Sequence, residues 1–257
     1  MRRSKALEKM RAGKLVRTCA LGHYIPAFIR HAAHFGFDCI WLDLEHRAMS
    51  DNDVRSLLGF CHQFDIDCMI RSPTLERVRL YRYLEDGAAG LMFPHVTTVA
   101  DAEGLVEAAK FPPLGNRGID GAGLDSDFYL QGGPGYTDDA NRETFIVAQI
   151  ESPQALDNVE GIAAVEGIDA VFIGPADLGL RLQHQDGSIT MEEATKRVAA
   201  AAAAHGKAWG RPAGTPELLQ ELYDQGARLL AQGGEFLAIL QVLEGASNAF
   251  ESVESTK

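Results

Sequence analysis

Phe145-Ile146-Val147-Ala148-Gln149-Ile150-Glu151-Ser152-Pro153 joins a largely apolar run of strand length to the start of a helix. Ser152 is a suitable N-cap, and Pro153 follows at the first helical position, where a missing N–H costs nothing. A strand that leads directly into a helix is the repeating unit of a parallel sheet with crossover helices.

The same alternation recurs along the whole chain. Eight strand-length runs are predicted, at Cys19–Gly22, Cys39–Leu44, Cys68–Arg71, Gly90–Pro94, Phe145–Ile150, Ala170–Gly174, Lys207–Gly210 and Arg228–Gln232. Eight alternations in 257 residues fit one (β/α)8 TIM barrel, so we expect a single catalytic domain over residues 1–257. An open doubly wound sheet is the second choice, and the lack of a G-x-G-x-x-G after the first run disfavours it.

The predicted helices have start and stop signals with physical causes. The expected N-caps are Ser50 (with Asp53), Ser152, Thr190 (with Glu193) and Thr215, and the expected left-handed C-terminal glycines are Gly206 and Gly226. One segment breaks the pattern: residues 111–142 are rich in glycine and proline and too long for a simple barrel connection. A lid or a subunit contact is as good an interpretation of this segment as a surface excursion.

Composition excludes several classes of partner. The formal net charge is −12, so nucleic acid and anionic membrane surfaces would be repelled. No run reaches the roughly 18 apolar residues of a membrane span, and the basic N-terminal segment lacks the apolar core of a signal peptide. We expect a soluble, cytoplasmic protein. The four cysteines have no C-x-x-C spacing and are interpreted as core thiols, with a catalytic thiol as the minor alternative.

Polar residues gather just after the predicted strands, where a barrel of this kind forms its active site. Glu151 and Asp177 end neighbouring strands, and two converging carboxylates repel unless a cation or proton lies between them. A hard divalent ion such as Mg²⁺ or Mn²⁺ would satisfy them. Taken singly, each carboxylate could instead cap its helix or pair with an arginine.

His46 and Arg71 are the other candidates for chemistry. His46 follows Asp43 and Glu45, and a carboxylate can orient an imidazole for acid/base work, so His46 is preferred over the other seven histidines, which we interpret as ordinary hydrogen-bonding residues. Arg71 closes an apolar run, where it would either stabilise an oxyanion or form a structural salt bridge.

Four motifs together resemble the HpcH/HpaI class II aldolases, also called the 4-hydroxy-2-oxoheptanedioate or 2-dehydro-3-deoxyglucarate aldolase family. They are Trp41-Leu42-Asp43-Leu44-Glu45-His46, Phe111-Pro112-Pro113-Leu114-Gly115-Asn116-Arg117-Gly118, Gln149-Ile150-Glu151 and Val171-Phe172-Ile173-Gly174-Pro175-Ala176-Asp177-Leu178. The similarity covers nearly the whole chain, and the last motif is highly specific.

The resemblance implies an aldolase that uses pyruvate, or a close 2-oxo acid, as nucleophile and an aldehyde as acceptor. It implies a divalent metal ion (Mg²⁺, Mn²⁺ or Co²⁺) on Glu151 and Asp177, and Arg71 against the oxo group of pyruvate. His46 with Asp43 would perform acid/base chemistry, and the substrate carboxylate would lie against Gln149, Gly174, Pro175 and Ala176. The eighth helix would be exchanged between subunits of a trimer or hexamer.

The departures from the family pattern lie on the aldehyde side. Where family members often carry an Asp from a neighbouring subunit, this chain has Glu85, followed by Asp86. Arg211 could bind a second substrate carboxylate or face solvent. Three alternatives stay open: an oxaloacetate decarboxylase or other enolate-forming lyase, a Schiff-base aldolase with Lys207 as nucleophile, and a non-catalytic binding protein on the same barrel.

Overall fold

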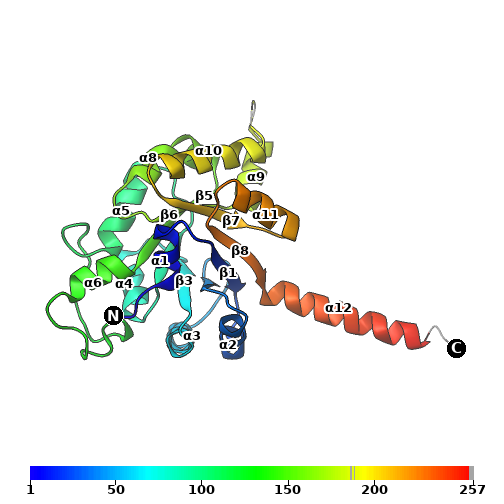
Figure 1. The fold of residues 1–257 in the computed structure, drawn as a ribbon, viewed down its shortest axis with the longest axis horizontal. Helices are drawn as coiled ribbons and strands as arrows, with labels where there is room; N and C mark the ends of the chain where they lie inside the picture. The colour runs from blue at the N-terminus through cyan, green and yellow to red at the C-terminus, as the bar shows by residue number, and fades with distance from the viewer. Residues whose placement is uncertain (186, 188, 255–257) are drawn as a thin grey trace.

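The computed structural model describes residues 1–185, 187 and 189–254, and its eight parallel strands close into a barrel in the order β1 to β8 (Figure 1). The strands are β1 (Val16–Leu21), β2 (Cys39–Asp43), β3 (Asp67–Arg71), β4 (Gly90–Phe93), β5 (Phe145–Ile150), β6 (Ala170–Ile173), β7 (Ala208–Pro212) and β8 (Leu229–Gly234). Each overlaps a predicted run. Because β8 pairs with β1, the sheet is a closed TIM barrel and the open doubly wound alternative is wrong.

Helices alternate with the strands and cover the barrel. They are α1 (Lys5–Arg11), α2 (Pro26–His34), α3 (Asp51–Gln63), α4 (Arg77–Glu85), α5 (Val99–Ala109), the 3₁₀ turn η1 (Leu124–Ser126), α6 (Tyr136–Glu143), α7 (Pro153–Asp157), α8 (Val159–Ala164), α9 (Pro175–Gln183), α10 (Met191–Ala204), α11 (Pro216–Asp224) and α12 (Glu235–Glu254). The predicted N-caps are confirmed at α3, α7, α10 and α11. Gly206 and Gly226 both have positive φ, as predicted.

The barrel has an apolar interior and a second apolar layer between strands and helices. Residues such as Met69, Val147 and Phe172 fill the interior, while Ile70, Ile146 and Val171, one position away, pack under the helices. All four cysteines are free and buried. Burial raises the pKa of the Cys19 thiol to about 12, so the prediction of core thiols holds and the catalytic-thiol alternative is disfavoured.

Side chains on a strand alternate between the barrel interior and the helix layer. This alternation places polar side chains at the C-terminal ends of the strands, which we call the mouth of the barrel. Asp43, Arg71 and Gln149 continue the inward-facing rows of Cys39, Met69 and Val147, because side chains two apart share a face of a strand. Asp43 and Arg71 are also register partners on β2 and β3. The strands therefore deliver these groups to one place.

The opposite end of the barrel is closed by the N-terminal segment. Ala6, Leu7 and Met10 of α1 pack with the interior residues. The fully buried Asp67 accepts hydrogen bonds from Ser4 Oγ at 2.8 Å and from Ala6 N at 2.7 Å. The N-terminal segment thus covers this end of the barrel.

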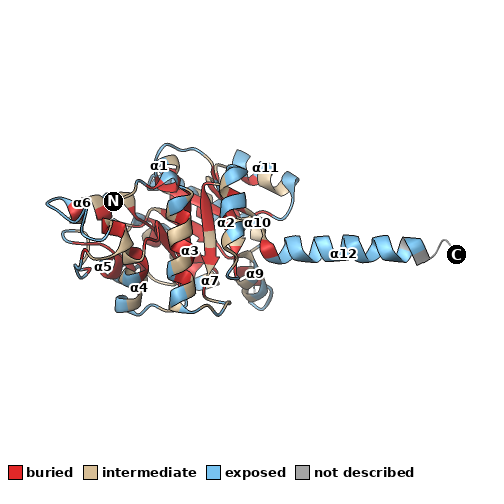
Figure 2. Cartoon of the chain, turned by 90° about the horizontal axis from the view of Figure 1, so that it is seen from below, coloured by how far each residue is buried: buried red, intermediate tan, exposed pale blue. Residues whose placement is uncertain are grey.

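The last helix, α12, projects away from the barrel (Figure 1), and Figure 2 shows that it is buried at its first residue, Glu235, and exposed along most of the rest. Its exposed apolar side chains are Phe236, Leu237, Ile239, Leu240, Val242, Leu243, Phe250 and Val253. Among the described helices, none is both long and apolar enough to cross a membrane.

The irregular segment 111–142 packs along α4. Gly118 faces Tyr81, and Gly123 lies against the carbonyl of Glu85. The segment leaves Phe128 and Leu130 exposed. Its contacts within the chain thus run along the barrel flank, which leaves the interpretation as a subunit contact open.

Candidate active site

Three potential metal ligands converge at the mouth. Glu45 follows β2, His95 follows β4 and Glu151 follows β5, and one ligand atom from each lies within 4.8 Å of the others. His95 stands between the two carboxylates, with Nδ1 3.1 Å from Glu151 Oε1 and Nε2 3.2 Å from Glu45 Oε1. The backbone N–H of His95 also donates to Glu151 Oε1 at 2.8 Å.

Arg71 forms the other side of this cluster. Its Nε donates to Asp43 Oδ1 at 3.0 Å and its Nη2 to Asp43 Oδ2 at 2.7 Å, a paired arrangement that fixes the plane of the guanidinium. Nη1 lies 3.0 Å from Glu45 Oε2, and Cζ lies 5.1 Å from the centre of the Trp41 ring. Arg71 is therefore held rigidly against the carboxylates at the mouth.

The pKa values of two carboxylates at the mouth, Asp43 and Glu151, are shifted in opposite directions. Burial alone would raise the pKa of Asp43, but the hydrogen bonds and charge of Arg71 outweigh it and hold that pKa below its usual value. Burial raises the pKa of Glu151, and the nearby charges of Glu45 and Asp177 push it the same way against the opposing effect of His95. Glu151 is the carboxylate that most needs a cation.

Asp177 forms an ion pair with an arginine of its own helix. It lies in the first turn of α9, 41% exposed at its side chain, and its Oδ1 is 3.3 Å from Arg181 Nη2 one helical turn later. Arg181 also donates from Nη1 to the carbonyl of Glu151. Arg181 thus joins the two predicted metal ligands, and it lines a hollow of about 580 Å³ together with His95, Glu151 and Ser152.

Two buried oxygens at the mouth lack a hydrogen-bond donor among the described residues. They are Gln149 Oε1, on a side chain only 3% exposed, and Glu45 Oε2, which Arg71 approaches without hydrogen-bonding geometry. A Cβ on Gly174 would lie 2.7 Å from Gln149 Nε2 and 2.8 Å from Glu151 Oε2. Glycine at this position therefore lets the Gln149 amide and the Glu151 carboxylate lie close against the backbone at the start of α9. The carboxylate and amide oxygens gathered at the mouth are ligands that suit a hard cation.

His46 and Glu85 are not brought together within one chain. His46 is exposed, and its Nε2 lies 3.7 Å from Glu45 Oε2, while Asp43 accepts from its backbone N–H at 3.4 Å. Glu85 ends α4, which runs back from the mouth, so it lies at the far end of the barrel flank. Burial raises the pKa of Glu85.

Comparison with known proteins identifies the family. Residues 21–239 match the family described as HpcH/HpaI aldolase/citrate lyase. The chain belongs to this family. The resemblance inferred from the sequence motifs is thereby confirmed, and the protein is an aldolase, a carbon–carbon lyase, of the HpcH/HpaI family.

Individual relatives cover most of this HpcH/HpaI aldolase. A 4-hydroxy-2-oxovalerate aldolase from Novosphingobium aromaticivorans is 35% identical over 83% of this chain and 81% of the relative. A hydroxypyruvate/pyruvate aldolase from Pseudomonas aeruginosa is 31% identical over 95% of this chain and 91% of the relative. The crystal structure of an HpcH/HpaI aldolase from Desulfitobacterium hafniense DCB-2 matches with a TM-score of 0.86 and 29% identity over 95% of both chains.

Sequence reasoning missed His95 in this HpcH/HpaI aldolase. It was grouped with the ordinary histidines, although it follows the predicted run Gly90–Pro94 and so stands at a strand end like Glu45 and Glu151. The rule that selected the other residues would have found it. Its backbone has a φ of 59°, which is uncommon for a residue with a side chain.

The structure answers two other expectations about basic residues. Lys207 precedes β7 and donates to Ile168 O at 2.7 Å, so it lies at the end opposite the mouth and is poorly placed as a Schiff-base nucleophile. Arg211 does not line the mouth either: it alternates with Ala208 and Gly210 on β7 and faces the helix layer, 3.4 Å from Thr195 Oγ1. Burial lowers its pKa.

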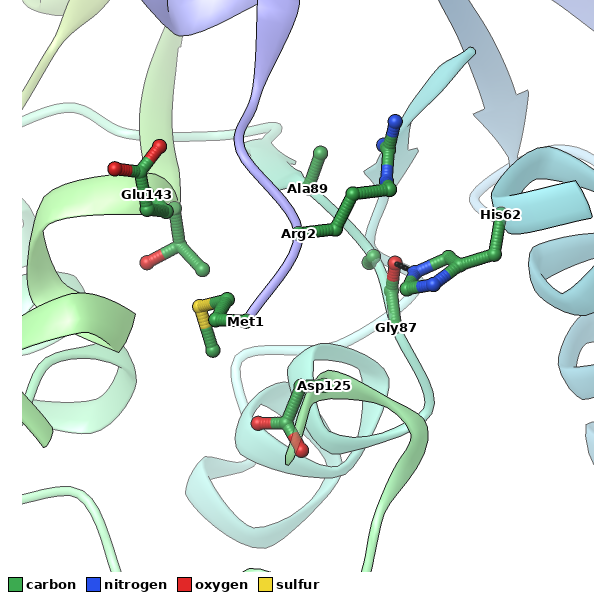
Figure 3. A pocket seen from close by; sticks show the side chains of 9 residues that line it. Met1, Arg2, His62, Gly87, Ala89, Asp125 and Glu143 are labelled. Carbon is green, nitrogen blue, oxygen red and sulfur yellow. Dashed lines mark hydrogen bonds between the residues drawn. The ribbon is translucent and has the colours of Figure 1, made fainter. Parts of the chain in front are cut away.

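A smaller hollow lies where several strands begin (Figure 3). Met1, Arg2, Asp125 and Glu143 line it together with His62, whose Nε2 is 3.0 Å from Gly87 O. Active sites of such barrels form at the other end of the strands. We therefore assign the site of this HpcH/HpaI aldolase to the mouth.

Proposed function

We propose that this protein is a divalent-metal-dependent aldolase that cleaves 4-hydroxy-2-oxo acids into pyruvate, or a close 2-oxo acid, and an aldehyde, and that catalyses the reverse addition. The observation that carries the proposal is the convergence of Glu45, His95, Glu151 and Arg71 at the mouth, beside two buried oxygens that accept no hydrogen bond from the described residues. The names of the aldolase relatives support the same class of substrate. In this proposal a single catalytic domain, residues 1–257, carries the activity.

The ion is Mg²⁺, Mn²⁺ or Co²⁺ in this proposal, held by Glu151 and Asp177. When bound, it supplies a Lewis acid that stabilises negative charge on the 2-oxo oxygen of the substrate. Burial is the main cause of the raised pKa of Glu151, and the negative charges of Glu45 and Asp177 add to it, so a cation beside these carboxylates would stabilise the ionised form. The Asp177 side chain is 41% exposed, and among the described residues its ion-pair partner is Arg181 of its own helix, so it can exchange Arg181 for a stronger cation.

Arg71 and the start of α9 bind the 2-oxo acid. Arg71 is held by Asp43 and Glu45, so its guanidinium can meet the charge that develops on the 2-oxo oxygen without reorganising. The substrate carboxylate lies against Gln149 and the backbone of residues 174–176, where the unpaired N–H groups of a helix N-terminus favour an anion.

His46, which is exposed beside Glu45, is the general acid and base in this proposal. In the cleavage direction it takes the proton of the 4-hydroxyl group while the bond between C3 and C4 breaks, and the electron pair passes to the 2-oxo acid fragment. A proton returned to C3 then completes pyruvate. Glu45, 3.7 Å from His46 Nε2, is the nearest carboxylate in the described chain and stabilises the protonated imidazole.

A second copy completes the site in this proposal. Glu85 is too far along the flank to reach His46 of its own chain, so we place it beside His46 of a neighbouring copy in a trimer or hexamer. The exposed apolar side chains of α12 support exchange of this helix between subunits, since such a surface is rarely left in water.

The experiment compares Glu151→Gln with Glu166→Gln, the same change at an exposed position. The proposal predicts that Glu151→Gln lowers pyruvate release from 4-hydroxy-2-oxopentanoate by about 100-fold or more, because a preorganised charged group is lost, while Glu166→Gln leaves it unchanged. Equal rates in both variants would refute the proposed role of Glu151.

The same assay separates the enolate-forming alternatives. Oxaloacetate is offered to the wild-type protein in parallel, with release of CO₂ as the readout. Decarboxylation without cleavage of any 4-hydroxy-2-oxo acid would favour a decarboxylase, and binding of pyruvate without turnover of either substrate would favour a non-catalytic barrel.

A further inference from the structure

His95 is the residue whose position the aldolase reaction does not yet explain. Its imidazole uses both ring nitrogens, one toward Glu151 and one toward Glu45. Resting on the function proposed above, we propose that His95 supplies a nitrogen ligand to the ion bound at Glu151, that Glu45 orients its ring, and that this nitrogen makes the site prefer Co²⁺ over Mg²⁺.

The separation of the donor atoms fits this role. Metal–nitrogen and metal–oxygen bonds are about 2.1 Å long, so two ligand atoms at right angles around one ion lie about 3 Å apart. His95 Nδ1 and Glu151 Oε1 are 3.1 Å apart. The backbone N–H of His95 also donates to Glu151 Oε1 at 2.8 Å, which fixes the position of this carboxylate relative to the imidazole.

Glu45 supplies the partner that a metal-binding histidine usually has. A ligating imidazole commonly donates its second ring N–H to a carboxylate, which fixes the tautomer and strengthens the nitrogen ligand. His95 Nε2 lies 3.2 Å from Glu45 Oε1, and Arg71 anchors the same carboxylate from the other side. The carboxylate, imidazole and carboxylate thus form a continuous row across the mouth.

A second observation points to a ligand at this place independently of the cluster. Gln149 is 97% buried, yet its Oε1 has no hydrogen-bond donor among the described residues. Gln149, on β5, precedes Glu151 by two residues, and its Nε2 and Glu151 Oε2 both lie against Gly174. A buried acceptor without a donor is costly, so the free Oε1 beside this cluster points to a charged or polar ligand at the mouth.

The chemistry of the donors sets the preference. Carboxylates and water suit Mg²⁺, whereas imidazole suits the later first-row ions, whose affinity for nitrogen rises along the series from Mn²⁺ to Cu²⁺. One nitrogen added to a carboxylate site therefore raises its affinity for Co²⁺ far more than its affinity for Mg²⁺.

The test uses His95→Asn, because Asn tolerates the left-handed backbone of this position and keeps its N–H. His46→Asn is the matched control, since His46 also neighbours Glu45 but is not proposed as a ligand. Isothermal titration of the metal-free proteins with Co²⁺ and Mg²⁺ gives both affinities, and pulsed EPR of the Mn²⁺-loaded proteins detects a coordinated nitrogen directly.

We expect His95→Asn to lose about 100-fold in affinity for Co²⁺ and less than about threefold for Mg²⁺, and to lose the nitrogen coupling. His46→Asn should keep both. A wild-type protein without nitrogen coupling, or a coupling that survives in His95→Asn, overturns the role of His95. If metal-dependent cleavage persists in that case, the proposed function stands; if the protein binds no divalent ion at all, both proposals fail.

Discussion

The residues at the mouth were predictable where their position depends only on the strand that carries them. Asp43, Arg71, Gln149 and Glu151 each extend an inward-facing row, so a period of two and a strand end were enough to select them. Distances between elements were not predictable in this way. The strand-end rule also places His95 at the mouth, but its closeness to Glu45 and Glu151 depends on how the ends of β2, β4 and β5 converge in the closed barrel, which the sequence does not give.

Gly174 supports a first prediction at this scale. Gly174→Ala would place a methyl group 2.7 Å from Gln149 Nε2 and 2.8 Å from Glu151 Oε2, inside the space where substrate and ion meet. We expect at least a tenfold loss of kcat/KM with less than a few degrees' change in Tm, measured by steady-state kinetics and calorimetry.

Gly179→Ala is the control for this change, because it lies on the same helix and its added methyl group would find only ordinary contact with Met191 at 3.5 Å. Its activity should stay at the wild-type level. Equal activity losses in the two variants would mean that the effect comes from the helix and not from the site.

Lys110 supports a prediction about pH. Its Nζ is buried and donates to Thr144 O at 2.6 Å, and burial lowers its pKa from 10.5 to about 8. Between these two pH values the unfolded chain holds a proton that the folded chain has released, so the free energy of unfolding rises with pH by about 1.4 kcal/mol per unit from this group.

Lys110→Met removes this titration together with its hydrogen bonds. The variant should be less stable than the wild type, and the difference should grow as the pH rises from 8 toward 10. Urea denaturation at pH 7.5, 9 and 10 measures both proteins under matched conditions. A stability difference that is constant over this range would show that Lys110 keeps its ordinary pKa when the protein is folded.

Elements were the most predictable level of this molecule. The strands lie within a few residues of their predicted bounds, because apolar runs of four to six residues between capped helices leave little choice of secondary structure. Caps were predictable for the same local reason. Arg211 shows the limit of this predictability. Its side chain could be assigned to the mouth or to the helix layer only from the exact register of β7, because a shift of one residue moves a side chain from one face of the strand to the other.

The N-cap of α7 supports a prediction at the scale of elements. Ser152 accepts a hydrogen bond from Ala155 N at 3.1 Å directly after Glu151. Ser152→Ala should cost about 1 kcal/mol of stability and, by loosening the turn that carries Glu151, should also weaken Mg²⁺ binding severalfold.

Thr215→Ala removes the equivalent cap of α11, where Thr215 accepts from Leu218 N at 3.2 Å on a helix that carries none of the proposed ligands. It should cost a similar free energy of unfolding and leave Mg²⁺ affinity unchanged. Urea denaturation and titration calorimetry on both variants decide the matter, and a parallel loss of Mg²⁺ affinity in both would count against a local effect of Ser152.

The whole molecule contains one feature that sequence patterns do not explain, the projecting α12. Its amphipathic sequence predicts a helix. It does not predict what the apolar side of the helix packs against, because no described part of this chain covers that side. The family resemblance supplied the expectation of an exchanged helix, and association of copies remains a proposal.

Substitution on α12 tests this proposal. Leu240 and Leu243 are both 62% exposed. The double variant Leu240→Glu, Leu243→Glu should dissociate a trimer or hexamer into monomers with an intact barrel, and activity should fall because Glu85 no longer reaches a neighbouring His46.

Light scattering coupled to gel filtration measures the mass, and circular dichroism checks the fold. Glu251 lies near the end of the same helix and provides a variant, Glu251→Gln, that should leave the mass unchanged. A wild-type protein that is already monomeric and fully active would contradict the proposal that a second copy completes the site.

The central claim is metal-dependent cleavage at the mouth, and the most direct measurement of it is pyruvate release from 4-hydroxy-2-oxo acids after EDTA treatment and after return of Mg²⁺, Mn²⁺ or Co²⁺. We predict that EDTA abolishes release and that an added ion restores it, because the proposal assigns to the ion the stabilisation of negative charge on the 2-oxo oxygen of the substrate. Cleavage that continues at the full rate in EDTA would contradict the account.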